Sequence, residues 1–301
     1  MNYLDLVKRA WEITGKHKFL WIFGLFLGGY SVGSSGSSFD NNYSNGTDNG
    51  QSIDLIEKGK EIFFANLILI GIIAFIILFV LLILIFIKTV SHGAIIAGVN
   101  EIEEIGKSNF TKAFKAGLKY FWKILVLQIL SGLSIIIIMA VLGLPVVLLF
   151  VLNMPFRGFI LGLLAFIIFV PLAILINFTL TYALRAIVIN NKKLFTSIKI
   201  GFNILKKNLL ASFLISIILF AINFAITIIV LIVLLFLGLL FGIPMVVIGI
   251  IINIDAGIVG SILLIMLGIL LIGVFFAFIG AILNTFQSTL WTLVYRKLTH
   301  K

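Results

Sequence analysis

The chain has 301 residues, of which 62% are hydrophobic and 11% are charged, and its formal net charge is +11. Its mean hydropathy is +1.28. A soluble domain has about 45–50% apolar and about 25% charged residues, so this composition excludes a soluble fold and predicts a polytopic membrane protein. The chain has no cysteine, which excludes disulfides and thiolate metal sites.

Hydrophobic runs long enough to cross a bilayer recur along the whole chain. A helix needs about 20 apolar residues to cross the hydrocarbon core. Six runs meet this requirement, at residues 19–38, 62–87, 124–152, 159–184, 209–254 and 258–290. We therefore expect an all-α fold with six transmembrane helices, in which residues 1–301 form a single membrane domain.

The first run is the weakest of the six. Its strongly apolar core covers only residues 19–30, and together with the basic segment 1–18 it also resembles a signal peptide. Residues 31–61 are rich in Ser, Gly and Asn and contain five carboxylates, which predicts a flexible external loop. The segment 1–18 shares its pattern with two later segments, and this favours a structural role over a signal peptide.

Proline interrupts the third and fifth runs, in Gly143-Leu144-Pro145 and Gly242-Ile243-Pro244. Because proline removes a backbone donor and bends or ends a helix, each span is expected to end near its proline. Residues 241–254 then either re-enter the membrane or form a seventh span.

The basic residues are distributed unequally between the ends of the runs. All of the 22 Lys and Arg residues except Lys58, Lys60 and Arg157 lie within residues 1–18, 88–123, 185–207 and 296–301. Positive residues mark the cytoplasmic side of a membrane protein. We therefore expect a multi-pass protein of the cell membrane with both termini in the cytoplasm and an even number of spans.

A basic amphipathic segment precedes the first, third and fifth runs. The three segments align on Lys8, Lys115 and Lys199. A small residue follows two positions later in each copy, and a second Lys follows eight positions later: Ala10, Gly117 and Gly201, then Lys16, Lys123 and Lys207. This register predicts three internal repeats, at approximately 1–90, 107–186 and 192–297. Each repeat would be an in-plane cytoplasmic helix followed by a helical hairpin.

The basic segments place their Lys residues opposite an apolar stripe. Helices of this kind lie at the membrane interface with Lys reaching the head groups. Anionic lipids are thus the expected partner of Lys8, Lys16, Lys112, Lys115, Lys119, Lys123, Lys199, Lys206 and Lys207. The alternative is that these residues only set the topology. Nucleic acid is not expected, and the sequence leaves open a protein partner or a homo-oligomer.

Small residues and polar residues within the spans predict helix packing. Close contact between helices is expected at Gly24, Gly28, Gly117, Gly158, Gly162 and Gly201. The larger polar residues of the spans are Asn66, Gln128, Asn177, Asn223, Asn284 and Gln287. Hydrogen bonding between helices is the expected role of these residues, with a polar path through the membrane as the alternative.

Residues suited to catalysis do not cluster in the sequence. All eleven acidic residues fall outside the predicted spans, and His17, His92 and His300 lie far apart. The group Glu101-x-Glu103-Glu104 could suggest a cation site, but capping or solvating the end of a helix is the favoured role. We expect no enzyme, no catalytic residue, no metal site and no cofactor.

One segment carries a resemblance to a known family. Residues 186–210, AIVINNKKLFTSIKIGFNILKKNLL, resemble the cytoplasmic signature of the membrane domain associated with bacterial glycerophosphodiester phosphodiesterases and of related stand-alone prokaryotic membrane proteins of unknown function. The N-terminal KHKFLWIFGLFLGG is similar to proteins of the same group. The sequence departs from the family at Thr196-Ser197 and at Gly201, and it contains no phosphodiesterase domain. The resemblance therefore implies an architecture and no catalytic residue.

Two functions fit these observations. The first is a non-enzymatic scaffold or accessory protein at the inner leaflet, in contact with anionic lipids. The second is a transporter or channel for a small uncharged or amphipathic substrate. Co-purification with a stable partner would favour the first, and substrate-dependent flux in proteoliposomes would favour the second.

The charge distribution predicts the side of the membrane on which each connection lies. Reporter fusions after Asn49, Asn153 and Ile254 should report an external location, because the connections there carry few basic residues. Fusions after Ser108, Asn191 and Lys301 should report a cytoplasmic location. A C-terminal reporter that reads external would contradict the six-span topology and favour a seventh span near Pro244.

Overall fold

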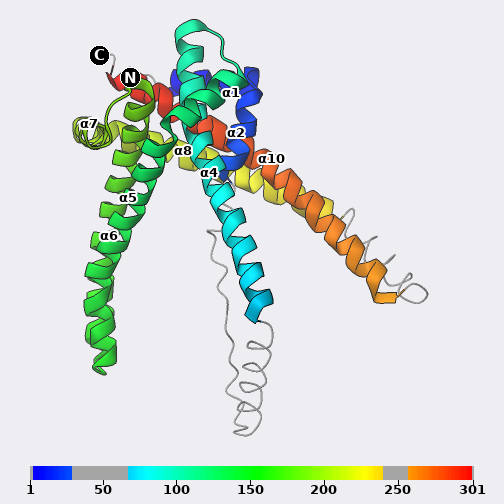
Figure 1. Cartoon of the computed structure of the whole chain (residues 1–301). Coiled ribbons are helices and arrows are strands. Elements are labelled where there is room, and N and C mark those ends of the chain that lie inside the picture. Colours follow the sequence, from blue (N-terminus) through cyan, green and yellow to red (C-terminus); the bar gives the residue numbers. More distant parts are fainter. Residues whose placement is uncertain (1–2, 29–66, 240–256, 300–301) are drawn as a thin grey trace.

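The computed structural model describes residues 3–28, 67–239 and 257–299, and in these ranges the chain folds only into helices (Figure 1). The helices are α1 (Tyr3–Lys16), α2 (Phe19–Gly28), α4 (Leu67–Ile105), α5 (Phe110–Val151), α6 (Pro155–Asn190), α7 (Leu194–Lys207), α8 (Leu209–Leu237) and α10 (Gly257–Thr299). For this part of the chain the all-α prediction is confirmed.

Five of these helices are long and apolar enough to cross a membrane, namely α4, α5, α6, α8 and α10. They correspond to five of the six predicted spans. The first predicted span is represented by α2, whose ten residues are too few to cross a bilayer. Residues 29–38 of that span, the predicted loop 31–61 and the segment 241–254 lie outside the described residues.

The structure corrects two predictions about α5. The sequence predicts an in-plane helix that ends near residue 123 and a span that ends near Pro145, but α5 is one helix of 42 residues that contains Pro145. In the third copy, Asn208 ends α7 and precedes α8, and its side chain bonds the Ile204 carbonyl oxygen. The second copy has no such polar residue at the equivalent junction, Lys123-Ile124, so the helix continues. At Pro145 only one backbone donor is lost, which membrane helices tolerate.

The buried side chains gather at one end of the molecule. There α1, α2 and α7 pack against the C-terminal parts of α4, α6 and α10 and the N-terminal parts of α5 and α8. Beyond this packed end, α4, the pair α5 and α6, and α10 diverge in three directions (Figure 1). Their apolar side chains are exposed there, for example Phe75 at 68% and Phe166 at 66%. Surfaces of this kind suit contact with lipid chains.

Three carboxylates near the end of α4 connect it to other helices. Each accepts a bond from a basic residue of a different helix: Glu101 from Lys112 of α5 (3.0 Å), Glu103 from Arg9 of α1 (2.8 Å) and Glu104 from Arg296 of α10 (3.4 Å). Exposed ion pairs contribute about 0–1 kcal/mol each, so these pairs orient helices more than they stabilise them. No group of metal-ligating side chains occurs among the described residues, and these carboxylates serve as ion-pair partners.

The aligned small residues lie at close contacts between helices. A Cβ atom on Gly117 would collide with the carbonyl oxygen of Val90 in α4, and one on Gly201 would collide with the carbonyl oxygen of Thr179 in α6. The corresponding Ala10 is fully buried on α1, which packs mainly on α10. Each basic segment thus meets the long helix that precedes it or, for α1, the last helix of the chain.

Two further glycines, Gly158 and Gly162 of α6, are packed less closely against α5 than Gly117 and Gly201 are against their partner helices. The nearest atoms to a Cβ at these positions belong to the side chains of Phe150, at 3.0 Å, and Val146, at 3.4 Å. Because side chains can shift more easily than backbone, a methyl group at these two positions would be tolerated better than one at Gly117 or Gly201.

We expect Gly117→Leu and Gly201→Leu to lower the thermal unfolding midpoint of the purified protein and its folded yield. Each added side chain would meet a neighbouring backbone, and overpacking costs about 1–3 kcal/mol or more. Gly132→Leu on α5 is the matched control, because nothing lies within 4 Å of a Cβ there. Equal midpoints for all three variants would contradict the close contacts at Gly117 and Gly201.

Candidate functional site

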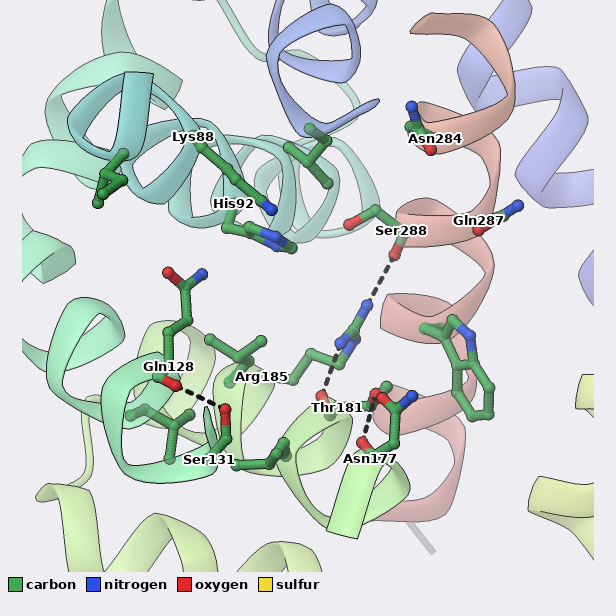
Figure 2. Close-up of a pocket in the computed structure, with 16 residues that line it drawn as sticks. Lys88, His92, Gln128, Ser131, Asn177, Thr181, Arg185, Asn284, Gln287 and Ser288 are labelled. Atoms are coloured by element: carbon green, nitrogen blue, oxygen red, sulfur yellow. Dashed lines mark hydrogen bonds between the residues drawn. The ribbon is translucent and has the colours of Figure 1, made fainter. Parts of the chain in front are cut away.

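A polar cavity of about 500 Å³ lies where the packed end meets the diverging parts of the long helices (Figure 2). Five helices line it, and Leu27 is the contribution of α2. The polar residues of the lining are Lys88 and His92 from α4, Gln128 and Ser131 from α5, Asn177, Thr181 and Arg185 from α6, and Asn284, Gln287 and Ser288 from α10. Among the described residues of the lining there is no Asp or Glu, so the cavity is rich in donors and positive charge.

Arg185 is the most deeply buried of the charged residues in this lining, with 5% of its surface exposed. Its Nη1 donates to the Thr181 carbonyl oxygen at 2.6 Å, and its Nη2 donates to the Ser288 carbonyl oxygen at 3.3 Å. Its Nε has no hydrogen-bond partner among the described residues. A guanidinium group has five N–H donors, so Arg185 retains donors for a ligand.

Two more basic residues face the same space from α4. Lys88 and His92 are four positions apart and therefore project from one face of the helix. Figure 2 shows both side chains directed toward the open centre of the cavity, with Arg185 on the other side of it. Lys88 and Arg185 are like charges, which disfavour one another in a site of reduced dielectric. An anion held between these two side chains would relieve this repulsion.

Amide side chains in the lining of the cavity bond neighbouring helices. The Thr89 hydroxyl donates to Gln128 Oε1 at 3.2 Å, which joins α4 to α5 and leaves the N–H groups of the Gln128 amide for another partner. On α10, the Asn284 amide donates to the Gly24 carbonyl oxygen of α2 at 3.3 Å, and the Gln287 amide donates to Asn223 of α8 at 2.9 Å. These bonds are interhelical, as expected from the sequence.

The predicted packing glycines of α2 fix its distance from α10. The Asn284 amide nitrogen lies where a Cβ of Gly28 would be, and the Ala281 carbonyl oxygen lies where a Cβ of Gly24 would be. The Thr285 hydroxyl donates to the Leu20 carbonyl oxygen at 3.1 Å. The close approach brings α2 against α10, so that Leu27 reaches the cavity.

The nine Lys residues predicted to contact lipid lie elsewhere, on α1, α5 and α7. Lys16 donates to Glu12 at 2.7 Å, and this bond is the main cause that lowers the pKa of the Glu12 carboxyl. Lys112 pairs with Glu101, and Lys123 donates to the Asn191 side chain at 3.2 Å. The other six are exposed: Lys8, Lys115, Lys119, Lys199, Lys206 and Lys207. The structure does not bring these nine residues together with the cavity.

Sequence reasoning missed the three basic residues of the cavity. The charge distribution in the sequence places Lys88 and Arg185 in cytoplasmic connections, and it predicts no role for His92. A signal was present in the sequence, because Lys88 and His92 are four positions apart directly after an apolar run, and Arg185 interrupts the apolar segment 182–189. Ionisable residues in such segments tend to be functional. Of the six polar residues assigned to the spans, Gln128, Asn177, Asn284 and Gln287 do line the cavity.

The long apolar helices and the polar cavity between them define a multi-pass membrane protein. Residues 17–297 match the model of a family of unknown function (DUF7544), so the chain belongs to that family. Neither the curated proteins nor the solved structures contain a match to the chain. The family match gives no link to the membrane domain of glycerophosphodiester phosphodiesterases, and that resemblance stays a prediction.

We expect Arg185→Met to leave the thermal unfolding midpoint in neutral detergent unchanged or higher than that of the unaltered protein. A buried charge without a carboxylate partner costs more than an apolar side chain of similar length, and replacing buried ionic groups often stabilises by about 1–4 kcal/mol. A fall of the midpoint by many degrees would instead show that Arg185 is needed to hold α6 against α10.

Proposed function

We propose that this protein is a non-enzymatic integral membrane protein that binds an anion of the phosphate type between α4, α6 and α10. The observation that carries this proposal is Arg185, a buried guanidinium group that lines a cavity together with Lys88 and His92 and bonds only two carbonyl oxygens, and no carboxylate, among the described residues. The binding site would serve a scaffold or accessory role at the cytoplasmic face of the cell membrane.

The chemistry of the lining favours an oxyanion over other ligands. Guanidinium groups bind phosphate and carboxylate oxygens through several N–H donors at once, and such charge-assisted bonds are about twice as strong as neutral ones. Lys88 adds positive charge from the opposite wall, and the His92 imidazole lies beside it. A cation would be repelled by this lining, and an apolar ligand would leave its donors unsatisfied.

The same proposal includes six membrane crossings arranged as three repeats. In support, α4, α6 and α10 end at the packed end, whereas α5 and α8 begin there (Figure 1). The sixth crossing is the one predicted from the sequence at residues 19–38, of which α2 is the described part. The packing of α1 on α10, of α5 on α4 and of α7 on α6 is the pattern that three repeats closed into a ring would give.

The distribution of charge supports a cytoplasmic location for the packed end. It carries the exposed Lys residues of α1, α5 and α7 together with Arg296 and Lys297 at the end of α10. Positive residues favour the cytoplasmic face. The exposed Lys residues would then contact anionic head groups, each contributing about 1 kcal/mol near an anionic surface.

Transport of an amphipathic substrate is the second candidate. The cavity lies between five helices, next to the apolar parts of the candidate spans. This position favours transport. Flux of an amphipathic anion across proteoliposomes that requires Arg185 would identify transport, whereas binding without flux would identify an accessory role.

Binding of methyl phosphate to the full chain in neutral detergent tests the anion site. Saturating methyl phosphate should raise the unfolding midpoint, because a ligand that binds only the folded state at 100 times its Kd adds about 2.7 kcal/mol of stability. Arg185→Met should abolish the increase. Lys199→Gln, which removes an exposed charge of α7, should retain it. An increase of equal size in both variants would contradict a site at Arg185, as would the absence of any increase.

A further inference from the structure

A second cavity of about 380 Å³ adjoins the first between α2, α8 and α10. Its lining is mainly apolar, with Leu25, Phe276, Ala277 and Leu283 among its residues. Asn284 and Gln287 line both cavities, so the two spaces share a wall. A charged chamber and an apolar chamber therefore lie side by side within one group of helices.

We propose that the ligand of this protein is an amphipathic phosphate, whose head occupies the cavity at Arg185 and whose alkyl chain occupies the apolar cavity between α2, α8 and α10. This inference rests on the proposed anion site and adds the class of its ligand. It commits to a membrane lipid or another long-chain phosphate, and free inorganic phosphate is the alternative that the experiment distinguishes.

The order of residues along α10 matches such a ligand. Ser288, which accepts from Arg185, is followed toward the far end by Gln287 and Asn284 and then by the apolar side chains of the second cavity. Along α10 the lining thus changes from the Ser288 carbonyl oxygen that Arg185 contacts, through two amides, to apolar side chains. A phosphate head, a polar linkage and a hydrocarbon chain would meet these three environments in the same order.

Three glycine residues leave space in the second cavity for the alkyl chain of the ligand. Gly28, Gly273 and Gly280 all line the apolar cavity. A Cβ on Gly273 would have no atom within 4 Å, and one on Gly280 would have only the Asn284 amide nitrogen at 4.0 Å. A larger side chain at either position would fill the cavity without disturbing a helix contact. On the same part of α10, Ile272 is 48% exposed and Phe276 is 37% exposed. The alkyl chain of a ligand can therefore enter this cavity from the lipid side.

The experiment compares two ligands that share a phosphate head group, using the full-length protein in the neutral detergent dodecyl maltoside. Methyl phosphate has no long alkyl chain, and dodecyl phosphate has an alkyl chain as long as that of the detergent. Native mass spectrometry measures the Kd of dodecyl phosphate as a mole fraction of the micelle, and thermal shift measures the Kd of methyl phosphate. The variants are Gly273→Leu and Gly280→Leu, which fill the apolar cavity from two positions. Gly71→Leu is the matched control, because it makes the same change on α4 where nothing lies within 4 Å.

We expect Gly273→Leu and Gly280→Leu each to weaken dodecyl phosphate binding by about tenfold, because the added side chain takes the space of the alkyl chain. Both variants should bind methyl phosphate as the unaltered protein does, and Gly71→Leu should bind both ligands unchanged. Arg185→Met should lose both ligands.

The outcomes separate this inference from the anion site on which it rests. If both cavity-filling variants bind dodecyl phosphate normally while methyl phosphate still depends on Arg185, the apolar cavity holds no chain and the inference is overturned, but the anion site stands. If the unaltered protein binds neither ligand, both proposals fail. If dodecyl phosphate binding depends on Gly273 and not on Arg185, the head lies elsewhere and the two-cavity arrangement is wrong.

Discussion

The C-terminal part of α4 is the surface on which the rest of the packed end is built. Val90, Ala94, Ile95, Ile96, Val99 and Ile102 are all at most 3% exposed. Three of them are consecutive, so neighbouring helices cover most of the circumference of α4 there. The backbone of another helix can contact the backbone of α4 only at a residue without a side chain. Gly117 of α5 meets that requirement.

This constraint also places the candidate site. Neighbouring helices are packed tightly against α4 from Val90 onward. Beyond the packed end the long helices diverge (Figure 1). Lys88 and His92 lie at the boundary, where the helices no longer fill the space between them. The cavity at Arg185 is therefore a consequence of tight packing on one side and divergence on the other, and its polar lining is joined by hydrogen bonds between helix pairs.

The sequence was sufficient to predict the helical class and five long apolar helices, because these depend on length and composition. Of the six glycines predicted to pack closely, Gly24, Gly28, Gly117 and Gly201 do so, whereas Gly158 and Gly162 are less tightly packed. It was not sufficient to predict that α5 continues through Lys123 and Pro145, since helix ends in an apolar segment depend on the neighbours that surround it. The grouping of Lys88, His92 and Arg185 depends on how α4 and α6 meet, and no periodicity within either helix specifies that. The polar residues Gln128, Asn284 and Gln287 could be recognised in advance because a single amide in an apolar span requires a partner.

A structure of the full chain with arsenate, a phosphate analogue that can be located by its anomalous scattering, tests the central claim most directly. The account predicts an arsenic peak inside the cavity, with an oxygen within hydrogen-bond distance of Arg185 Nε and the ion between α4 and α6. Peaks only at the exposed Lys residues of α1, α5 and α7, with none beside Arg185, would contradict it.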